Sequence, residues 1–295
     1  MSCATDAIVI GAGAAGLAAA RALGQAGLQV VVLEADSHIG GRAYTEIMPD
    51  GSAFDLGCHW MHSASLNSFV QTADALGVRY ERRDGYGRCG YFRDGEWLSD
   101  QEIAAGQRAM KRREKAMATA WEQGRDQSVL ETVEREGPWT EALDYYDALD
   151  TSSDVDQISI GDIVSYNDTE ENWPVVDGYG TLVARWAADV PVQLNTAATT
   201  IRWGNSGVSV ETHRGVLQAK CAVIAVSTGV LGSGDIRFLP ELPAEKGQAI
   251  EALPLGNYNR IRLVVDRHLF ADYVPERIVT EQSGNSPMQL SIRPY

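Results

Sequence analysis

Residues 7–17 read AIVIGAGAAGL, and this stretch decides the fold. Four apolar residues precede three glycines in the spacing G-x-G-x-x-G, and an alanine-rich run continues to Ala26. The pattern predicts a buried strand over 7–10, a tight glycine turn and a helix over 14–26. This order is typical of the first βαβ unit of a dinucleotide-binding domain.

Each glycine of this loop has a separate physical task. Gly11 permits the tight turn, Gly13 lets the backbone approach a diphosphate with no Cβ in the way, and Gly16 lets the helix pack closely on the sheet. The free N–H groups at the start of the helix, together with the positive end of its dipole, then face the phosphates.

Glu34 is the acidic partner expected of such a loop. In the preceding run 29–33 (QVVVL) every residue after Gln29 is apolar, as expected of a parallel strand buried on both faces. Glu34 follows it, 18 residues after Gly16, where a carboxylate can accept hydrogen bonds from ribose hydroxyls. Strand, glycines, helix, strand and terminal carboxylate in this order predict a bound dinucleotide, but they do not separate NAD from FAD.

The segment 34–45 (EADSHIGGRAYT) adds a second glycine pair followed by Arg42. Two adjacent glycines allow another close approach of backbone to a cofactor. Arg42 can bind a phosphate through two parallel hydrogen bonds. A surface turn with an exposed arginine is the alternative interpretation.

The second half of the chain contains more strand patterns. Residues 199–220 form three alternating runs separated by glycine-containing turns, which predict an antiparallel meander. The run 221–226 (CAVIAV) is wholly apolar and predicts another buried strand. Residues 260–265 (RIRLVV) alternate with Ile261, Leu263 and Val265 on one face, so they predict a further strand with Arg260 on the other face.

Residues 86–174 are mostly helical in pattern. A capping box from Ser99 to Glu102 opens a helix. Ile103, Met110, Met117 and Trp121 follow along this helix, and its two methionines and its tryptophan are expected in the core. Segments of buried-strand character flank this region, which predicts an inserted domain. We expect a dinucleotide-binding domain over 1–85 and 175–245, and a second domain over 86–174 and 246–295.

Charge is unevenly distributed along the chain. From Glu131 to Asn172 there are 13 acids and one base, so this stretch carries −12 of the net charge of −15. Solvated helix faces explain such a pattern. A field that attracts a cationic substrate is the sharper alternative. Basic residues gather from Arg108 to Lys115, where we expect a solvated helix face.

Composition argues against several classes of protein. Lys and Arg total 25 against 40 Asp and Glu, which is the wrong sign for a nucleic-acid binder. The uncharged runs 7–20 and 221–234 have 14 residues each, fewer than the ~18 that a membrane span needs. No basic stretch precedes the first run, so a secretory signal is not expected. The histidines and the widely spaced cysteines lack metal-binding patterns, which predicts reduced thiols and a cytoplasmic location. The cysteines are Cys3, Cys58, Cys89 and Cys221.

With these motifs the sequence resembles the flavin-dependent amine oxidase superfamily. The resemblance rests on residues 9–23, 34–45 and 54–63 (FDLGCHWMHS), and it continues at 175–183 (VVDGYGTLV) and through much of 221–265. The first two motifs are common to many FAD oxidoreductases, whereas the later ones favour the amine oxidase branch. The resemblance implies an α/β fold. It would comprise a Rossmann-like FAD-binding domain, with a parallel sheet and a β-meander, and an inserted α+β substrate domain.

The resemblance also implies which residues hold the cofactor FAD. The ADP part would be bound by the two glycine motifs and the end of the second strand: Gly11, Ala12, Gly13, Ala15, Gly16, Glu34, Ala35, Gly41 and Arg42. Residues 57–61, among them Gly57, Cys58, His59 and Trp60, would run past the isoalloxazine ring. Ala198 occupies the place of a family valine that contacts the adenine through its backbone, a contact that would survive the change.

Two residues are candidates for catalysis by the same resemblance. His62 falls where animal polyamine oxidases carry a histidine close to the amine channel, and a histidine there could take a proton from an ammonium or hydrogen-bond it. A structural histidine is the alternative. Arg260 stands where many amine oxidases have a lysine that holds a water near the flavin. Because arginine stays protonated, it could fix a water or a substrate carboxylate but could not act as a base.

The implied activity is oxidation of an amine, which could be a polyamine, a monoamine or an amino acid. In this family a hydride passes from the amine to flavin N5, the imine is hydrolysed, and O2 reoxidises the flavin to give H2O2. Family members continue well past residue 295, so we expect a truncated chain with an incomplete substrate domain. Two alternatives stay open: an FAD desaturase or oxidase of an apolar substrate, and a non-catalytic FAD-binding fragment.

Overall fold

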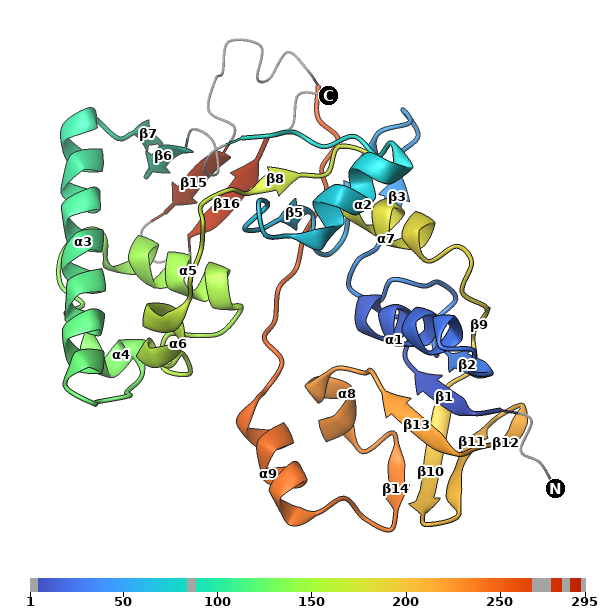
Figure 1. The fold of residues 1–295 in the computed structure, drawn as a ribbon. Coiled ribbons are helices and arrows are strands. Elements are labelled where there is room, and N and C mark those ends of the chain that lie inside the picture. Colours follow the sequence, from blue (N-terminus) through green and yellow to red (C-terminus); the bar gives the residue numbers. More distant parts are fainter. Residues whose placement is uncertain (1–4, 84–88, 267–276, 283–286, 293–295) are drawn as a thin grey trace. The chain divides into compact units, whose positions relative to one another are not determined.

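The computed structural model describes residues 5–83, 89–266, 277–282 and 287–292. The chain divides into two compact units (Figure 1). The first comprises residues 1–82 and 173–255, and the second comprises residues 83–172 and 256–295. The assignment of an FAD domain and a substrate domain to particular residues stays a prediction.

A parallel sheet organises the first unit. Its strand order is β13 (Cys221–Ile224), β1 (Ala7–Ile10), β2 (Val30–Leu33) and β9 (Val192–Gln193), and every neighbouring pair is parallel. Helix α1 (Ala14–Gln25) connects β1 to β2. All four residues of β1 are buried, as expected for an apolar strand covered on both faces. The Rossmann-like sheet predicted from the glycine motif is therefore confirmed.

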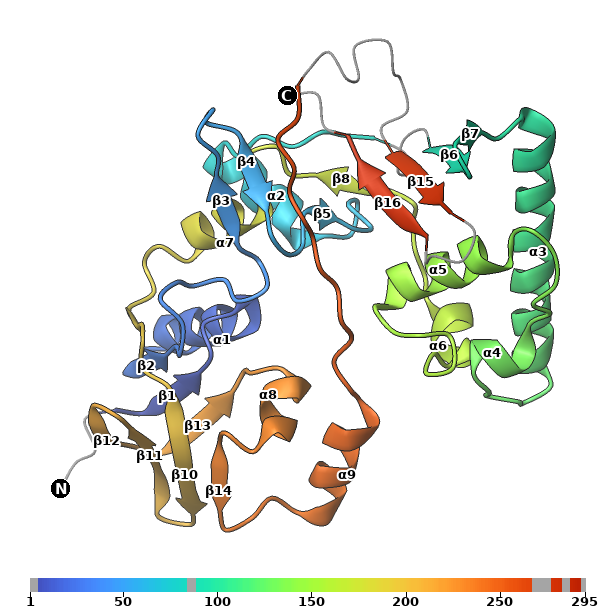
Figure 2. The same ribbon diagram turned by 180° about the vertical axis from the view of Figure 1, so that it is seen from behind.

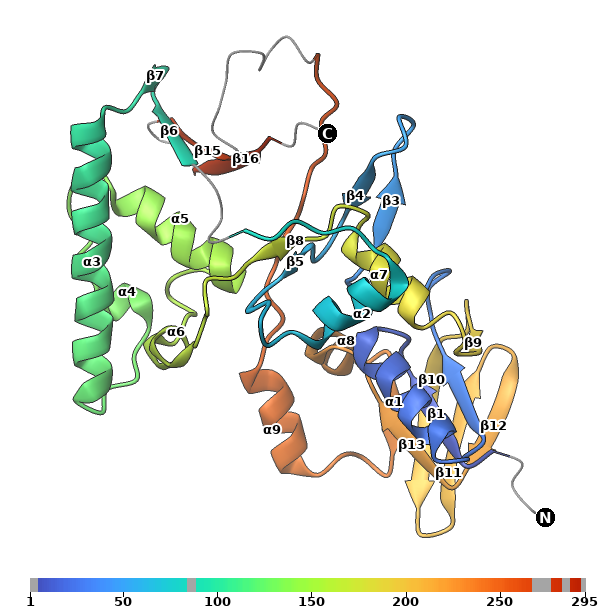
Figure 3. The same cartoon turned by 45° about the horizontal axis from the view of Figure 1, so that its top comes forward.

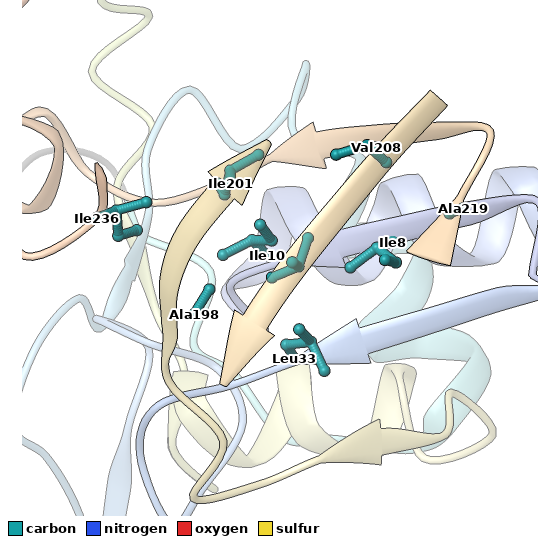
Figure 4. Packing of buried hydrophobic residues seen from close by; sticks show 9 residues of the cluster. Ile8, Ile10, Leu33, Ala198, Ile201, Val208, Ala219 and Ile236 are labelled. Carbon is teal, nitrogen blue, oxygen red and sulfur yellow. The ribbon is translucent and has the colours of Figure 1, made fainter. Parts of the chain in front are cut away.

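Successive residues of β1 face two different cores. Ile8 and Ile10 pack with Leu33 and the meander (Figure 4). Val9 packs instead with Leu17 of α1. Figure 3 shows α1 on one side of β1 and the meander on the other. This alternation follows from the two-residue period of a strand, which sends neighbouring side chains to opposite faces.

The meander forms a second sheet of the same unit. Its order is β12 (Gly215–Ala219), β11 (Gly207–Thr212), β10 (Ala198–Gly204) and β14 (Arg237–Leu239). The first three strands are antiparallel, as predicted, and β14 adds a parallel strand to β10. The short helices α8 (Thr228–Ser233) and α9 (Ala244–Ala252) flank β14 in sequence.

The rest of the first unit surrounds the segment after β4. It contains the hairpin of β3 (Thr45–Ile47) and β4 (Ala53–Asp55), seen clearly in Figure 2, and the pair β5 (Trp60–Met61) and β8 (Trp173–Pro174). Helices α2 (Ser68–Leu76) and α7 (Tyr179–Trp186) complete it. Buried Met61, Ala73, Val175 and Leu182 form their common core.

The second unit has a mixed sheet and four helices among its described residues. The sheet order is β16 (Met288–Ser291), β15 (Arg277–Glu281), β6 (Cys89–Arg93) and β7 (Glu96–Trp97). The helices are α3 (Asp100–Glu122), α4 (Val129–Thr132), α5 (Thr140–Thr151) and α6 (Ile160–Ser165). No helix in the described part of the chain is long and apolar enough to cross a membrane.

The capping box at the start of α3 is confirmed, since the Ser99 and Glu102 side chains each bind the other's backbone N–H. The expectation that the apolar residues of this helix lie in the core is only partly correct. Met117 is buried, whereas Met110 and Trp121 are 40% and 39% exposed. The Trp121 ring nevertheless packs against Gly161 in α6, where an added Cβ would lie 2.6 Å from it.

The strand predicted over 260–265 is wrong. This segment has no regular structure, and Ile261, Leu263 and Val264 are 71–86% exposed. Alternation alone does not make a strand, because a strand is stabilised by a hydrogen-bonded neighbour and a covered face. The segment forms no ladder with another described residue.

Arg113 joins α3 to α5 and is not part of a solvated basic face. It is 6% exposed and donates to Asp144 and Asp147, each at 2.6 Å. Arg135 binds the other oxygen of Asp144. Burial raises the pKa of Asp147, and the charge of Arg113 opposes this shift. The expected solvated face is therefore confirmed for exposed neighbours such as Arg112, but wrong for Arg113.

Arg113→Ala is expected to destabilise the second unit by about 3 kcal/mol, because it leaves half-buried Asp147 without its cation and Asp144 with Arg135 alone. The matched control is Arg112→Ala on the exposed face of the same helix, which should change stability by less than about 0.5 kcal/mol. Urea unfolding and hydrogen exchange of α3 and α5 measure both. The deficit should shrink as pH falls, since a protonated carboxyl needs no cation; equal stabilities at pH 7 would contradict this assignment.

Candidate functional site

The turn between β1 and α1 depends on two glycines that the sequence singled out. Gly11 has φ +99°, a conformation that L side chains rarely adopt, and a Cβ there would lie 2.7 Å from the carbonyl oxygen of Ala225. A Cβ on Gly16 would overlap the carbonyl oxygen of Gly11. The two residues thus permit the tight turn and the close packing of helix on sheet, as predicted.

Gly13 faces open space. Its backbone is extended, with φ −70° and ψ 174°, and a Cβ added there would meet nothing within 4 Å. It is also the N-cap of α1, whose first-turn amides receive no side-chain cap. Ala15 lies exposed in this first turn. The backbone therefore forms a cradle whose N–H groups can bind an anion.

The second glycine motif lies against the first. Gly40 donates its N–H to the carbonyl of Ala12 at 2.8 Å and bridges to Gly13. Gly41 has φ +57°, and a Cβ on it would lie 3.4 Å from the Cα of Gly13. Arg42 follows immediately, with an exposed side chain. The structure thus brings together two motifs that are separated by more than 20 residues in the sequence.

The Glu34 carboxylate lies at the edge of this cradle. It accepts hydrogen bonds from the amides of Ala12, at 2.6 Å, and Asp36, at 2.9 Å. A carboxylate has about four acceptor positions, so further donors can still bind it. Ala35 beside it is exposed. Residues 195–196 bind the backbone of 34–36 and lead into β10, which begins at Ala198.

The segment 56–62 is held between two other segments. On one side the N–H groups of Leu56 and Cys58 donate to the carbonyls of Tyr44 and Arg42, at 2.9 and 3.3 Å. A Cβ on Gly57 would overlap the Arg42 carbonyl, so only glycine allows this contact. On the other side β5 pairs with β8, and Val175 donates to the His59 carbonyl at 3.1 Å.

The two histidines of this segment and Arg260 differ in exposure. His59 is 5% exposed, and its ring meets that of Trp60 edge-on at 4.7 Å. His62 is exposed, and its carbonyl accepts a hydrogen bond from the Asn67 amide. Arg260 belongs to the other compact unit and is half-buried, with its guanidinium 5.7 Å from the Tyr258 ring.

Asp55 was not among the predicted site residues, yet it is buried directly before this segment, at 2% exposure. It accepts hydrogen bonds from the Thr45 hydroxyl at 2.5 Å and from the amides of Tyr179 and Gly180 at 3.0 and 3.3 Å. Two signals were present in the sequence: a carboxylate inside FDLGCHWMHS, and the two glycines of VVDGYGTLV, which allow α7 to begin against another chain segment.

Tyr179 is a second residue that the sequence did not single out. Burial raises its pKa to about 12, nearby Cys58 adds to the shift, and a hydrogen bond with Asn67 opposes it. Its hydroxyl therefore stays protonated at neutral pH and is placed near the predicted ring-facing segment.

A shallow apolar hollow of about 380 Å³ lies elsewhere on this unit, between residues 38–45 and α7. It includes Ile39, Tyr44 and Ala184 but none of the predicted site residues. The open glycine cradle is chemically better suited to a nucleotide, because its donors are backbone amides at a helix N-terminus.

Two family models match the chain. Residues 9–73 match an NAD(P)-binding Rossmann-like domain, and residues 102–291 match the family described as flavin containing amine oxidoreductase. The second match covers more than half of the chain.

Two of the similar proteins come from plants. The chain is 29% identical over 296 residues to polyamine oxidase 4 of Oryza sativa subsp. japonica, and 31% identical over 288 residues to probable polyamine oxidase 4 of Arabidopsis thaliana. Each alignment covers 88% of this chain and 58% of the relative, so the chain spans little more than half their length. Cyclohexylamine oxidase from Brevibacterium oxydans IH-35A has a similar fold, with TM-score 0.65 and 22% identity over 84% of this chain and 63% of that one.

The raised pKa of Tyr179 predicts a loss of stability at high pH. A neutral phenol favoured by the fold contributes fully below the ordinary pKa of about 10, and the contribution disappears as pH rises through about 12. Between pH 9 and pH 11 the wild type should lose about 1 kcal/mol relative to Tyr179→Phe. Urea unfolding at both pH values measures this; parallel changes in the two proteins would contradict it.

Proposed function

The chain belongs to the flavin-containing amine oxidoreductase family, and from this premise we propose that it binds FAD and oxidises an amine. The observation that carries the proposal is the open glycine cradle at the start of α1, together with the family match. The chain spans 58% of the length of these two plant relatives. Amine oxidation by the whole protein is therefore proposed here together with FAD binding.

The cradle fits the diphosphate of FAD. The space in front of Gly13 is free, the amides of the first turn of α1 have no side-chain cap, and Gly41 brings a second segment of backbone close. In this proposal the amides of this turn bind the phosphates, assisted by the helix dipole. The exposed Arg42 guanidinium adds a positive charge beside them.

The adenosine end is proposed to lie along the end of β2. Glu34 accepts hydrogen bonds from ribose hydroxyls while it keeps the Ala12 amide as its partner. Ala35 and the backbone of Ala198 border the adenine. Hydrogen bonds between residues 34–36 and 195–196 hold these two segments together and support this arrangement.

The chemistry that FAD supplies when bound is acceptance of a hydride from the amine and its transfer to O2, with H2O2 as product. The part of the chain is to bind and orient the reactants. Residues 57–61 form the wall beside the ring, fixed on two sides by backbone hydrogen bonds. Trp60 and buried His59 exclude water from that wall.

His62 is proposed to act on the proton of the substrate. It follows β5 and is exposed, so a substrate nitrogen can approach its imidazole. A neutral imidazole can accept a proton from an alkylammonium or hold it by a hydrogen bond, which keeps the amine in its reactive form. We assign Arg260 a role in holding a water or a substrate carboxylate, where it cannot serve as a base.

The proposed substrates are small amines, which include polyamines, monoamines and amino acids. Two relatives are named polyamine oxidases, which supports an amine over a carotenoid or porphyrin precursor. The acidic stretch 131–172 supports attraction of a cation, although Asp144 and Asp147 within it are neutralised by arginines. The described cysteines form no disulfide with one another, as is usual in the cytoplasm, where we place the protein.

Gly13→Val should weaken FAD binding by more than about tenfold, because it puts a side chain where the diphosphate approaches. The fold has room for this side chain and a backbone conformation that accepts it, so the melting temperature without FAD should change little. The matched control is Gly24→Val, also open but at the far end of α1. Flavin fluorescence titration measures affinity; equal affinities of the two variants would exclude the cradle as the diphosphate site.

The amine oxidase assignment predicts that the FAD-loaded protein bleaches anaerobically with an amine and releases H2O2 in air. His62→Ala should lower the rate at least about 100-fold, because it removes the group that takes or holds the substrate proton. His213→Ala, an exposed histidine in the β11–β12 turn, is the control. A rate for His62→Ala that equals wild type at every pH would remove this role. FAD binding without turnover across polyamines, monoamines and amino acids would favour a non-catalytic fragment.

A further inference from the structure

We propose that Asp55 is a positioning residue for the flavin ring: with Thr45, it fixes the segment 56–62 by binding the start of α7. The inference rests on the proposed function, because it assumes that this segment borders the ring of bound FAD. Asp55 would not touch the reacting atoms. It would act through the backbone that follows it.

Asp55 caps a helix that is distant in sequence. Its two oxygens accept the amides of Tyr179 and Gly180, so one carboxylate provides partners for two of the first-turn amides of α7. No side chain from the helix's own N-cap, Gly178, does this. A negative charge at this end of a helix is favoured by the helix dipole, and at 2% exposure it is screened little by water.

Thr45 completes the arrangement. Its hydroxyl donates to Asp55 at 2.5 Å and accepts the amide of Thr181 at 3.0 Å. A Cβ on Gly180 would lie 2.6 Å from the backbone of Tyr44, so only a glycine at position 180 lets α7 begin this close to that segment. We name Asp55, Thr45 and the three amides of residues 179–181 the α7 clamp.

The α7 clamp closes a frame around the ring-facing segment. Residues 56 and 58 bind the backbone of 44 and 42, and residues 59–61 bind 173–175. Residues 42–44 precede Thr45 directly, and residues 173–175 precede α7 by only a few positions. The α7 clamp therefore joins the two segments that bind 56–62, namely 42–45 and 173–181. Loss of the clamp would loosen both of these segments.

Because Asp55 lies outside the glycine cradle, a substitution there should affect binding of the flavin ring and binding of the phosphates differently. The glycine cradle binds the phosphates, and none of the hydrogen bonds described for it involves Asp55 or Thr45. Loss of the α7 clamp should therefore leave ADP affinity nearly unchanged while it weakens FAD binding and alters the absorption spectrum of bound flavin. A general loss of folding would lower both affinities together.

The test compares four variants of the full chain. Asp55→Asn removes the negative charge of the side chain and places an NH2 group, itself a donor, next to the amides of Tyr179 and Gly180. Thr45→Val removes only the hydroxyl, and Thr45→Ser restores it. The matched control is Asp50→Asn, an exposed carboxylate in the turn of the same hairpin that accepts hydrogen bonds from the amide and hydroxyl of Ser52. For each protein we would measure ADP and FAD affinity by calorimetry, the visible flavin spectrum, and amide exchange without FAD.

Asp55→Asn and Thr45→Val are expected to bind FAD at least about tenfold more weakly, since each leaves an amide in the first turn of α7 without its acceptor. Their amides at 56–62 and 179–181 should exchange faster, while ADP affinity stays within about twofold. Thr45→Ser and Asp50→Asn should resemble wild type.

Two outcomes would overturn the inference. In the first, wild type binds FAD, and Asp55→Asn and Thr45→Val bind it equally well with an unchanged spectrum, so only the inference fails. In the second, ADP and FAD affinity fall together, which assigns Asp55 to general stability. If wild type itself binds no FAD, the proposed function fails and this inference fails with it.

Discussion

The structure depends on one constraint: the backbone between β1 and α1 must turn with its amides facing outward and no side chain in front of them. Gly11 makes the turn, Gly16 lets the helix lie against it, and Gly13 leaves the space in front open. A helix N-terminus without a side-chain cap is costly unless water or a ligand binds its amides. The first unit therefore presents backbone amides at the start of α1 that can bind an anion.

The cradle was predictable from sequence because its determinants are local. Strand, glycines and helix follow one another within residues 7–25, and each glycine's task comes from its own backbone. The α7 clamp was not predictable in the same way. Asp55 and the amides that it binds are about 124 residues apart, and a buried carboxylate looks the same in sequence as an exposed one. Arg113 illustrates the same limit, because its partners lie 31 and 34 residues away on another helix.

Periodicity predicted strands correctly where a neighbouring strand exists. The buried strand β1 and the meander strands all have hydrogen-bonded partners. Residues 260–265 have the same alternating pattern and form no ladder in the described part of the chain. An alternating sequence indicates which side chains would share a face of a strand. Whether a strand forms depends on a neighbouring strand that accepts and donates its backbone hydrogen bonds. The position of Arg260 on a strand face was inferred from that pattern, so its proposed role now rests on the resemblance alone.

The most direct measurement for the account as a whole is a crystal structure of the chain grown with FAD. The account predicts the diphosphate about 3 Å from the first-turn amides of α1, with Glu34 at the ribose and the ring beside residues 57–61. A diphosphate bound anywhere else, or an FAD whose ring lies away from that segment, would contradict it.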